Sequence, residues 1–203
     1  DLTKNLQSGP EERRAKRAES RGAAREMVDR ESAYPALPAS PPRDGPPNLL
    51  LISLDTVRAD HLSVYGYPLP TTPFLEGFAA RGAVFEQAMS QSNESAWSHA
   101  TLFTGQYPSE IAQPTYETYA MPSDALTVGG VLSNYRYQTA AFVGGGHVDE
   151  SFGFSSGFEY FSAEQGFSSL WHTAPKAASW IAQADPEQPW FVFVHGYDTH
   201  RPY

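Results

Sequence analysis

A helix start in the middle of the chain carries the side chains best suited to chemistry. The run is SNESAWSHATLFTG, residues 92–105, in which Ser95 precedes His99 by four positions and Gly105 ends the helix. The free N–H groups and the positive dipole end of a helix N-terminus favour an anion. A serine hydroxyl there could attack phosphorus or sulfur beside a metal, and His99, on the same helical face, could donate to an oxyanion. The alternatives are a helix-capping role for Ser95 and a packing role for His99.

A single carboxylate follows the first apolar run of the chain. Asp55 lies in LISLDTVRAD, just after the run NLLLIS at residues 48–53. Sites in α/β proteins form beyond the C-terminal ends of parallel strands, so this carboxylate is placed to bind a hard divalent cation, which prefers oxygen ligands. A turn-forming or helix-capping aspartate is the alternative.

Three further histidines lie close to the expected ends of strands. His147 follows three glycines in GGGHVDE, residues 144–150. Such a run lets a backbone approach a ligand closely, although glycine-rich turns are also common in ordinary loops. His195 ends the run WFVFVH, and His200 follows it in YDTHRPY. A histidine in such a place can protonate a leaving group or bind a charged oxygen.

The elements that must position these residues alternate between strand and helix from residue 48 onwards. This alternation predicts an α/β protein, an α/β/α sandwich around a mainly parallel sheet. The run over 48–54 lacks polar alternation, which is typical of a strand buried on both faces, so we expect it at the centre of the sheet. The expected strands are 48–54, 83–90, 139–144 and 190–195, and the expected helices are 72–82, 125–136, 173–184 and one beginning at Ser95.

The first 47 residues differ in composition from the rest of the chain. They hold 9 Lys and Arg against 8 Asp and Glu, and six of the fourteen residues at 34–47 are proline. A charged stretch with almost no apolar face, followed by a proline-rich one, predicts a flexible N-terminal segment. The folded domain is then expected over 48–203.

Composition excludes several classes of function and site. Residues 48–203 hold 5 Lys and Arg against 15 Asp and Glu, which disfavours nucleic acid as a partner. The 203 residues contain no cysteine, so a disulfide framework, a thiolate metal site and a cysteine nucleophile are all absent. No apolar run reaches the roughly 18 residues of a membrane-spanning helix.

Taken in order, these motifs resemble the N-terminal core of the sulfatase family, within the alkaline phosphatase superfamily. The segments that carry the resemblance are LISLDTVRADH, YGY, TTPFLEGFAARG and the run SAWSHATLFTGQYPS. The later segments YRYQTAAFVGGGHV, GFSSGFEYF and FVFVHGYDTHRPY also resemble the family. The similarity extends over nearly all of residues 48–203.

The resemblance implies a role for each matching position. Asp55 matches the first metal-binding aspartate, and Ser95 matches the nucleophile, which is also a metal ligand. His200 matches the histidine on the sulfate side and is implied to be catalytic. His99 and His147 are implied to bind the substrate. Thr56 stands where the family often has a second aspartate.

The family resemblance leaves the state of the nucleophile open. Many sulfatases oxidise a cysteine or serine to formylglycine, directed by a following Pro and Arg. Here Trp97 and His99 occupy those two positions. An unmodified Ser95 would resemble the nucleophile of the phosphatase and phosphodiesterase branches.

From the resemblance we expect metal-dependent hydrolysis of sulfuric esters, small molecules or glycans. Calcium is the expected ion, with magnesium or manganese as alternatives. A phosphoester hydrolase or phosphoryl transferase that uses unmodified Ser95 is one alternative function, and a catalytically silent binding protein is another. The resemblance also implies export to the periplasm or the extracellular space. The family completes its metal site with later residues, so we expect this chain to hold about half of a catalytic domain.

Overall fold

The computed structural model describes residues 45–111 and 120–200. The described chain divides into two compact units, one comprising residues 57–88 and the other comprising the remaining described residues. The expected flexible segment at 1–47 falls almost wholly outside the described residues. The larger unit holds the sheet and all of the predicted site residues.

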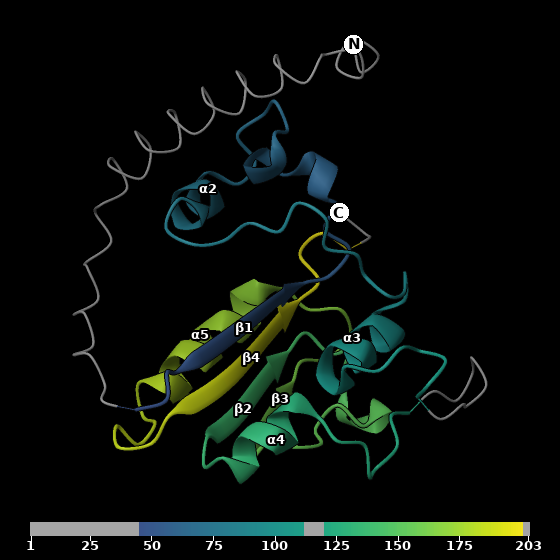
Figure 1. The fold of residues 1–203 in the computed structure, drawn as a ribbon, viewed down its shortest axis with the longest axis vertical. Helices are drawn as coiled ribbons and strands as arrows, with labels where there is room; N and C mark the ends of the chain where they lie inside the picture. The colour runs from purple at the N-terminus through teal and green to yellow at the C-terminus, as the bar shows by residue number, and fades with distance from the viewer. Residues whose placement is uncertain (1–44, 112–119, 201–203) are drawn as a thin grey trace. The chain divides into compact units, whose positions relative to one another are not determined.

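The larger unit is built on a sheet of four parallel strands (Figure 1). Its strands are β1 (Leu49–Leu54), β2 (Gln138–Val143), β3 (Tyr160–Ala163) and β4 (Trp190–Gly196), in the spatial order β1-β4-β2-β3. The expected strands at 48–54, 139–144 and 190–195 are therefore confirmed as strands, and the α/β class with a parallel sheet is confirmed. β3 was not expected from the sequence.

The expectation that the first strand lies at the centre of the sheet is wrong for the described residues. β1 pairs with β4 alone among them and lies at an edge of the sheet. Leu50 and Ile52 are 51% and 54% exposed, and in register they stand beside Val192 and Val194 of β4. A continuous apolar run indicates that a strand is suited to burial, but it does not determine how many neighbours the strand has.

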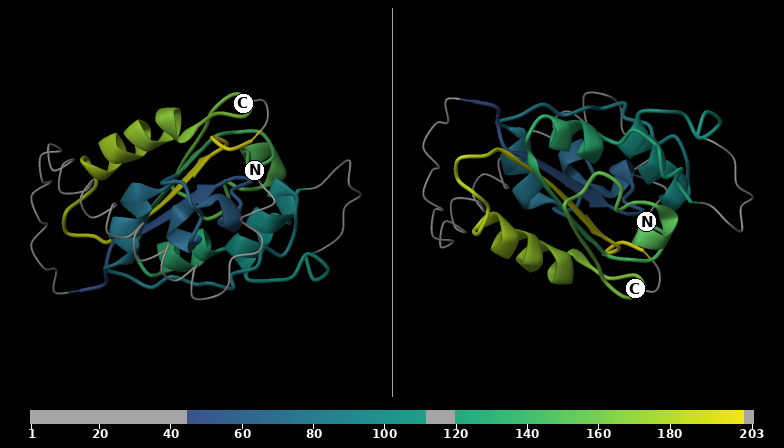
Figure 2. Two further views of the ribbon diagram at one scale, coloured as in Figure 1. Left: turned by 90° about the horizontal axis from the view of Figure 1, so that it is seen from above. Right: turned by 90° about the horizontal axis from the view of Figure 1, so that it is seen from below.

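Helices lie on both faces of the sheet, which gives the expected sandwich (Figure 2). On one face α3 (Ser95–Thr104) and α4 (Val128–Asn134) pack through a core that includes Ala100, Phe103 and Phe193. On the other face α5 (Leu170–Ile181) packs against β2 and β4 through a smaller apolar core. Aliphatic and aromatic side chains alternate between these two cores along each central strand, as the period of a strand requires.

Two helix boundaries differ from expectation because a hydroxyl side chain sets the start. Thr127 accepts a hydrogen bond from the Gly130 N–H at 3.1 Å, so α4 begins at Val128 and not at 125. Ser169 accepts one from the Trp171 N–H at 3.2 Å, so α5 begins at Leu170, ahead of the expected 173. Capping of this kind satisfies N–H groups that have no partner within the helix.

The smaller unit contains two 3-10 turns, η2 (Ala59–His61) and η3 (Ser63–Tyr65), and the short helix α2 (Pro73–Ala79). The expected helix at 72–82 is confirmed, with proline in its first turn, where the missing N–H costs nothing. The expected strand at 83–90 is wrong, because this segment forms turns and irregular backbone. A further 3-10 turn, η4 (Glu150–Phe152), belongs to the larger unit.

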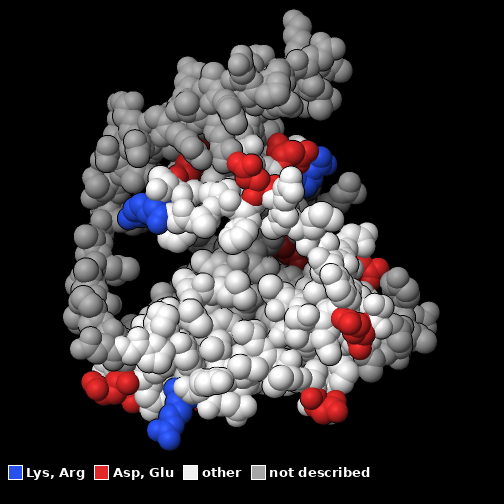
Figure 3. Space-filling model, in the orientation of Figure 1, with Lys and Arg blue, Asp and Glu red and all other residues white. Residues whose placement is uncertain are grey.

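The described surface carries few basic side chains. On the face shown in Figure 3, acidic side chains are scattered and basic ones are sparse, in line with 5 Lys and Arg against 15 Asp and Glu over residues 48–203. Within the described ranges, helices of membrane-spanning length and hydropathy are absent.

Candidate active site

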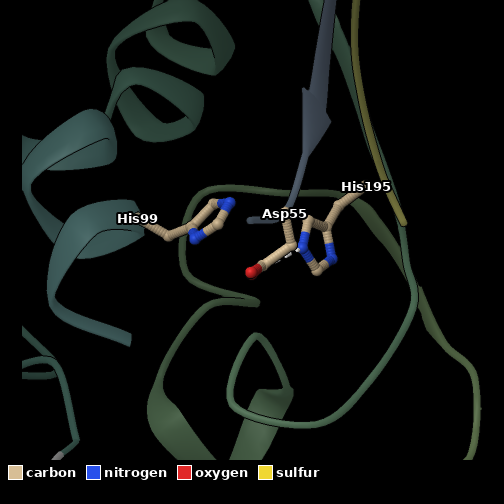
Figure 4. Close-up of side chains that lie close together, drawn as sticks. All are labelled: Asp55, His99 and His195. Carbon is tan, nitrogen blue, oxygen red and sulfur yellow. Dashed lines mark ion pairs between the residues drawn. The ribbon is translucent and has the colours of Figure 1, made fainter. Parts of the chain in front are cut away.

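Asp55, His99 and His195 converge at the C-terminal end of the sheet (Figure 4). One ligand-type atom from each residue lies within 4.8 Å of the others, and all three side chains are buried. Asp55 follows the end of β1, His195 lies near the end of β4, and His99 extends from α3. The three come from segments separated by more than forty residues, so the sheet and α3 together create the cluster.

The parallel pairing of β1 and β4 sets the position of Asp55. The Asp55 N–H donates to the Gly196 carbonyl at 3.0 Å, which continues the ladder one residue beyond β1. Because Ser53 is paired with His195 in register, the Asp55 side chain lies close to the imidazole. The distance from Asp55 Oδ2 to His195 Nε2 is 3.5 Å.

Both ring nitrogens of His99 are engaged within the protein. Nδ1 lies 2.8 Å from the Ser95 carbonyl oxygen, which can only accept, so Nδ1 carries the hydrogen. Nε2 then accepts from the Ser53 hydroxyl at 2.9 Å. Burial and the neighbouring His195 lower the pKa of His99 to about 4, so the ring is neutral near pH 7.

Substrate binding by His99 stays a prediction, and the hydrogen bonds of the ring bear on how it would act. A cationic or hydrogen-bond-donating partner for a substrate oxyanion needs a free N–H, and the described ring directs its only N–H to Ser95. His99 is also just 5% exposed. Its position instead makes it part of the environment of Asp55.

Asp55 remains ionised despite its burial. Burial raises the pKa of Asp55, but the His195 imidazole, the Ser95 hydroxyl and His99 lower it by more, so that the pKa falls below the ordinary aspartate value. A buried carboxylate held in its charged form suits the binding of a cation.

Ser95 is the first residue of α3 and does not cap it. The N-cap position is Glu94, and no side-chain cap of this helix occurs in the described structure. The Ser95 hydroxyl lowers the pKa of Asp55 and also opposes a rise in the pKa of Tyr197, so it lies near both groups. The capping alternative for Ser95 is therefore not observed, and its hydroxyl interacts with Asp55 and Tyr197.

Tyr197 connects the cluster to the glycine-rich loop. Burial and the charge of Asp55 raise the pKa of Tyr197 to about 12, which keeps its hydroxyl protonated. That hydroxyl donates to the Gly145 carbonyl at 3.2 Å and accepts from the His147 N–H at 3.2 Å. The loop is thereby fixed beside the ring of His195, whose centroid is 4.6 Å from that of Tyr197.

The glycines before His147 make room for neighbouring protein chain. A Cβ at Gly145, which has φ of +76°, would lie 2.1 Å from the Glu164 carbonyl oxygen, and one at Gly146 would lie 2.8 Å from the Phe167 ring. Close packing against neighbouring chain therefore explains these glycines, as in an ordinary glycine-rich turn. His147 itself is exposed and its ring packs against Phe167 and Phe152.

His200 lies next to this loop. Its ring stacks on Phe167 with a centroid distance of 5.1 Å and meets the edge of Tyr197 at 5.5 Å. His147 and His200 thus contact the same phenylalanine, and Tyr197 links both to the buried cluster.

His195 was noted in the sequence as a histidine at a strand end, but the family resemblance gave it no role. It is fully buried in β4, and neither ring nitrogen has a hydrogen-bond partner among the described residues. The sequence signal was the histidine itself, the one strongly polar residue in the apolar run WFVFVH.

The donor atoms around Asp55 fit the divalent metal that the family resemblance implies. Asp55 Oδ2 is buried without a hydrogen-bond partner in the described structure. This is what is expected of a carboxylate oxygen that serves as a metal ligand. The other donors beside it are two imidazole nitrogens. The set therefore fits a divalent ion, but it is richer in nitrogen than the oxygen sites that calcium prefers.

The chain matches one protein family over most of its length. The family model described as Sulfatase matches residues 47–203. The chain belongs to the sulfatase family. Among curated sulfatases, human N-acetylgalactosamine-6-sulfatase is 33% identical over 112 residues, which are 53% of this chain and 21% of that protein. The chain thus spans about a fifth of the length of this relative.

Solved structures share the fold of this sulfatase-family chain. The structure of BT4656 in complex with its substrate D-glucosamine-2-N,6-O-disulfate has a TM-score of 0.69 at 21% identity, covering 77% of this chain and 35% of that one. A protein of the alkaline phosphatase superfamily from Vibrio parahaemolyticus has a TM-score of 0.57 at 19% identity, covering 77% and 41%. These likenesses confirm the alkaline phosphatase-like α/β fold.

Proposed function

We propose that this sulfatase-family chain belongs to a metal-dependent sulfuric ester hydrolase and supplies its nucleophile, Ser95, and its first metal ligand, Asp55. The observation that carries the proposal is the Ser95 hydroxyl, which opens α3, does not cap it and lies beside the ionised Asp55. A hydroxyl so placed meets the oxyanion that the helix N-terminus attracts. Family membership supports sulfate as the group that is attacked.

In the proposed reaction, the Ser95 oxygen forms a bond to sulfur while the ester S–O bond breaks. The serine hydroxyl loses its proton to solvent, and the departing alcohol oxygen gains a proton. His200 is the proposed donor to that leaving oxygen, since its ring contacts Tyr197, which in turn contacts the ring of His195. Water then hydrolyses the sulfo-serine to regenerate Ser95 and release sulfate.

Asp55 is the proposed first metal ligand. When bound, the metal would lower the pKa of the attacking hydroxyl and neutralise charge on the sulfate oxygens. Asp55 is suited to hold it because its carboxylate remains charged in a buried position. Tyr197, whose pKa is raised to about 12, stays neutral and adds no negative charge beside Asp55.

Sulfated sugars are the proposed substrate class. BT4656, a structural neighbour, is solved with a glucosamine disulfate, and a curated relative is an N-acetylgalactosamine-6-sulfatase. His147 and His200, whose rings both contact Phe167, are the proposed substrate-side residues. A sugar ring could pack on that exposed aromatic side chain, Phe167.

A phosphoester substrate is the second candidate. The observation that favours it is the presence of Trp97 and His99 where the oxidation motif has Pro and Arg, which predicts that Ser95 stays a serine. The experiment compares sulfate and phosphate release from matched aryl and sugar esters by the full-length protein. Mass spectrometry of the peptide that holds Ser95 reports the loss of two hydrogens if formylglycine forms. Preferred cleavage of sulfate supports the proposal, and preferred cleavage of phosphate with intact serine favours the alternative.

A further inference from the structure

Two large aromatic side chains are exposed where α5 begins. Trp171 is 84% exposed and Phe167 is 52% exposed. Exposed apolar side chains that gather at one place mark a surface that binds a partner or a ligand. Trp171 is the second residue of α5, and the Cα–Cβ bonds of a helix are tilted toward its N-terminus. Trp171 therefore leans toward the segment that holds Phe167.

Backbone hydrogen bonds fix this segment to the loops that follow β2 and β4. The Ser168 N–H donates to the Gly144 carbonyl at 2.8 Å, and the Ser168 carbonyl accepts from the Tyr197 N–H at 2.9 Å. The Leu170 N–H donates to Asp198 Oδ2 at 2.8 Å. The two aromatic side chains are thus carried on a preformed surface, which lowers the entropy cost of binding a ligand there.

A hollow of about 640 Å³ lies beside Phe167, within the roughly 300–1,000 Å³ that ligand pockets occupy. Gly146 lines this hollow, and a Cβ built at that glycine would lie 2.8 Å from the Phe167 ring. Asp149, Glu150 and Glu164 also line it. Ionised carboxylates accept hydrogen bonds from hydroxyl groups. The hollow therefore suits a neutral ligand rich in hydroxyl groups and disfavours an anion.

Basic side chains are scarce in the described part of the larger unit. They are Arg136 and Lys176. Lys176 is paired with Glu164, and Arg136 lies just before β2, at the end of the sheet opposite the candidate site. A heavily sulfated glycan would therefore meet carboxylates here without cations to balance its charge.

We propose that Phe167 and Trp171 form an aromatic platform for a neutral sugar next to the sulfated one, so that the substrate is a sparsely sulfated glycan. An aromatic ring offers a large apolar face, on which the C–H face of a sugar ring packs without any need for charge. The carboxylates of the hollow accept hydrogen bonds from the hydroxyl groups of that sugar. The inference rests on the proposed function, because it places the sulfate ester itself at the candidate active site.

The test compares three sulfate esters as substrates of the full-length protein. They are an aryl sulfate, a neutral tetrasaccharide of galactose and N-acetylglucosamine that carries one sulfate, and a heparin tetrasaccharide. We expect the singly sulfated tetrasaccharide to have the highest kcat/KM. Trp171→Ala should raise its KM on the order of tenfold and lower the ratio of its kcat/KM to that of the aryl sulfate. Tyr135→Ala, which removes an exposed aromatic side chain just before β2, is the matched control and should change none of these values.

Calorimetry with the unsulfated form of the neutral tetrasaccharide separates the inference from the proposed function. The wild type should bind it equally well at low and high salt, because charge plays no part, and Trp171→Ala should bind it about tenfold more weakly. This pattern without hydrolysis of any ester would support the inference and count against the proposed function. Ester hydrolysis with a preference for the heparin tetrasaccharide, no binding by the wild type, or unchanged binding by Trp171→Ala would overturn the inference.

Discussion

The Asp55 carboxylate and the His195 imidazole lie 3.5 Å apart at the ends of two adjacent parallel strands, and both are buried. The backbone ladder fixes this pair, because the Asp55 N–H donates to the carbonyl of Gly196, the residue after His195. The Asp55 backbone therefore cannot move away from β4 without breaking this hydrogen bond. A charged group held so firmly without full compensation is a place where a protein binds a cation.

The charge of Asp55 is predicted to be essential to activity. Asp55→Asn preserves the shape of the side chain but removes the charge that would hold the metal, so the catalytic rate should fall by on the order of 100-fold or more. Ester hydrolysis by the full-length protein is the measurement. Asp124→Asn, which removes a carboxylate from an irregular segment outside the cluster, is the control and should leave the rate unchanged.

Ser95 is predicted to contribute little to stability. Because it does not cap α3, Ser95→Ala should remove only the interaction of its hydroxyl with Asp55, and it should lower the free energy of unfolding by about 1 kcal/mol. Thr127 does cap α4 and also donates to the Ser156 carbonyl at 3.0 Å. Thr127→Ala should therefore cost about 2 kcal/mol. Urea denaturation measures the free energy of unfolding of both variants. Equal decreases in the two would show that the Ser95 hydroxyl has a structural role.

Stability of the metal-free protein should fall as the pH drops below about 6.5. His99 has its pKa lowered to about 4 in the folded state, whereas an unfolded histidine binds a proton near pH 6.5. The unfolded state therefore binds more protons in this window, and acid favours unfolding. Between pH 7 and pH 5 the His99 contribution should be about 2 kcal/mol.

His99→Gln isolates that effect, because glutamine does not titrate. Urea denaturation across this pH range should give a weaker pH dependence for the variant than for the wild type. Parallel curves for the two proteins would mean that His99 is protonated in the folded state as readily as in the unfolded one.

A substitution outside the candidate site tests the left-handed backbone conformation of Arg136. Arg136 follows α4 with φ of +65°, one of two non-glycine residues in the left-handed region among those described. Arg136→Gly should stabilise the protein by up to about 1 kcal/mol, since glycine adopts this conformation without strain. Its neighbour Tyr135 has φ of −88°, and Tyr135→Gly should stabilise nothing. Thermal denaturation of the two variants gives the comparison.

Much of the larger unit was predictable because its signals are local. The apolar runs at 139–144 and 190–195 are too short for helices and too continuous for exposed strands, and both are central strands. The start of α3 at Ser95 followed from its small polar residues and its end from Gly105, which has φ of +70°. The edge position of β1 depends on pairing between distant segments, which a local pattern does not encode.

The candidate site was predictable only where its residues carry a local sequence signal. Asp55 and Ser95 could be recognised because each stands where a strand ends or a helix begins. His195 sits inside a strand, and only the register with β1 brings it to Asp55. The neutral state of His99 likewise comes from burial by residues far away in sequence.

The most direct test of the central claim is the rate of sulfate release from a sulfated sugar or aryl sulfate by the full-length protein and its Ser95→Ala variant. Ser98→Ala, one turn further along the same helix, is the control. If Ser95 is the nucleophile, Ser95→Ala should remove nearly all of the rate while its unfolding curve stays close to that of the wild type. Ser98→Ala should keep most of the activity. Full activity in a folded Ser95→Ala protein would contradict the account.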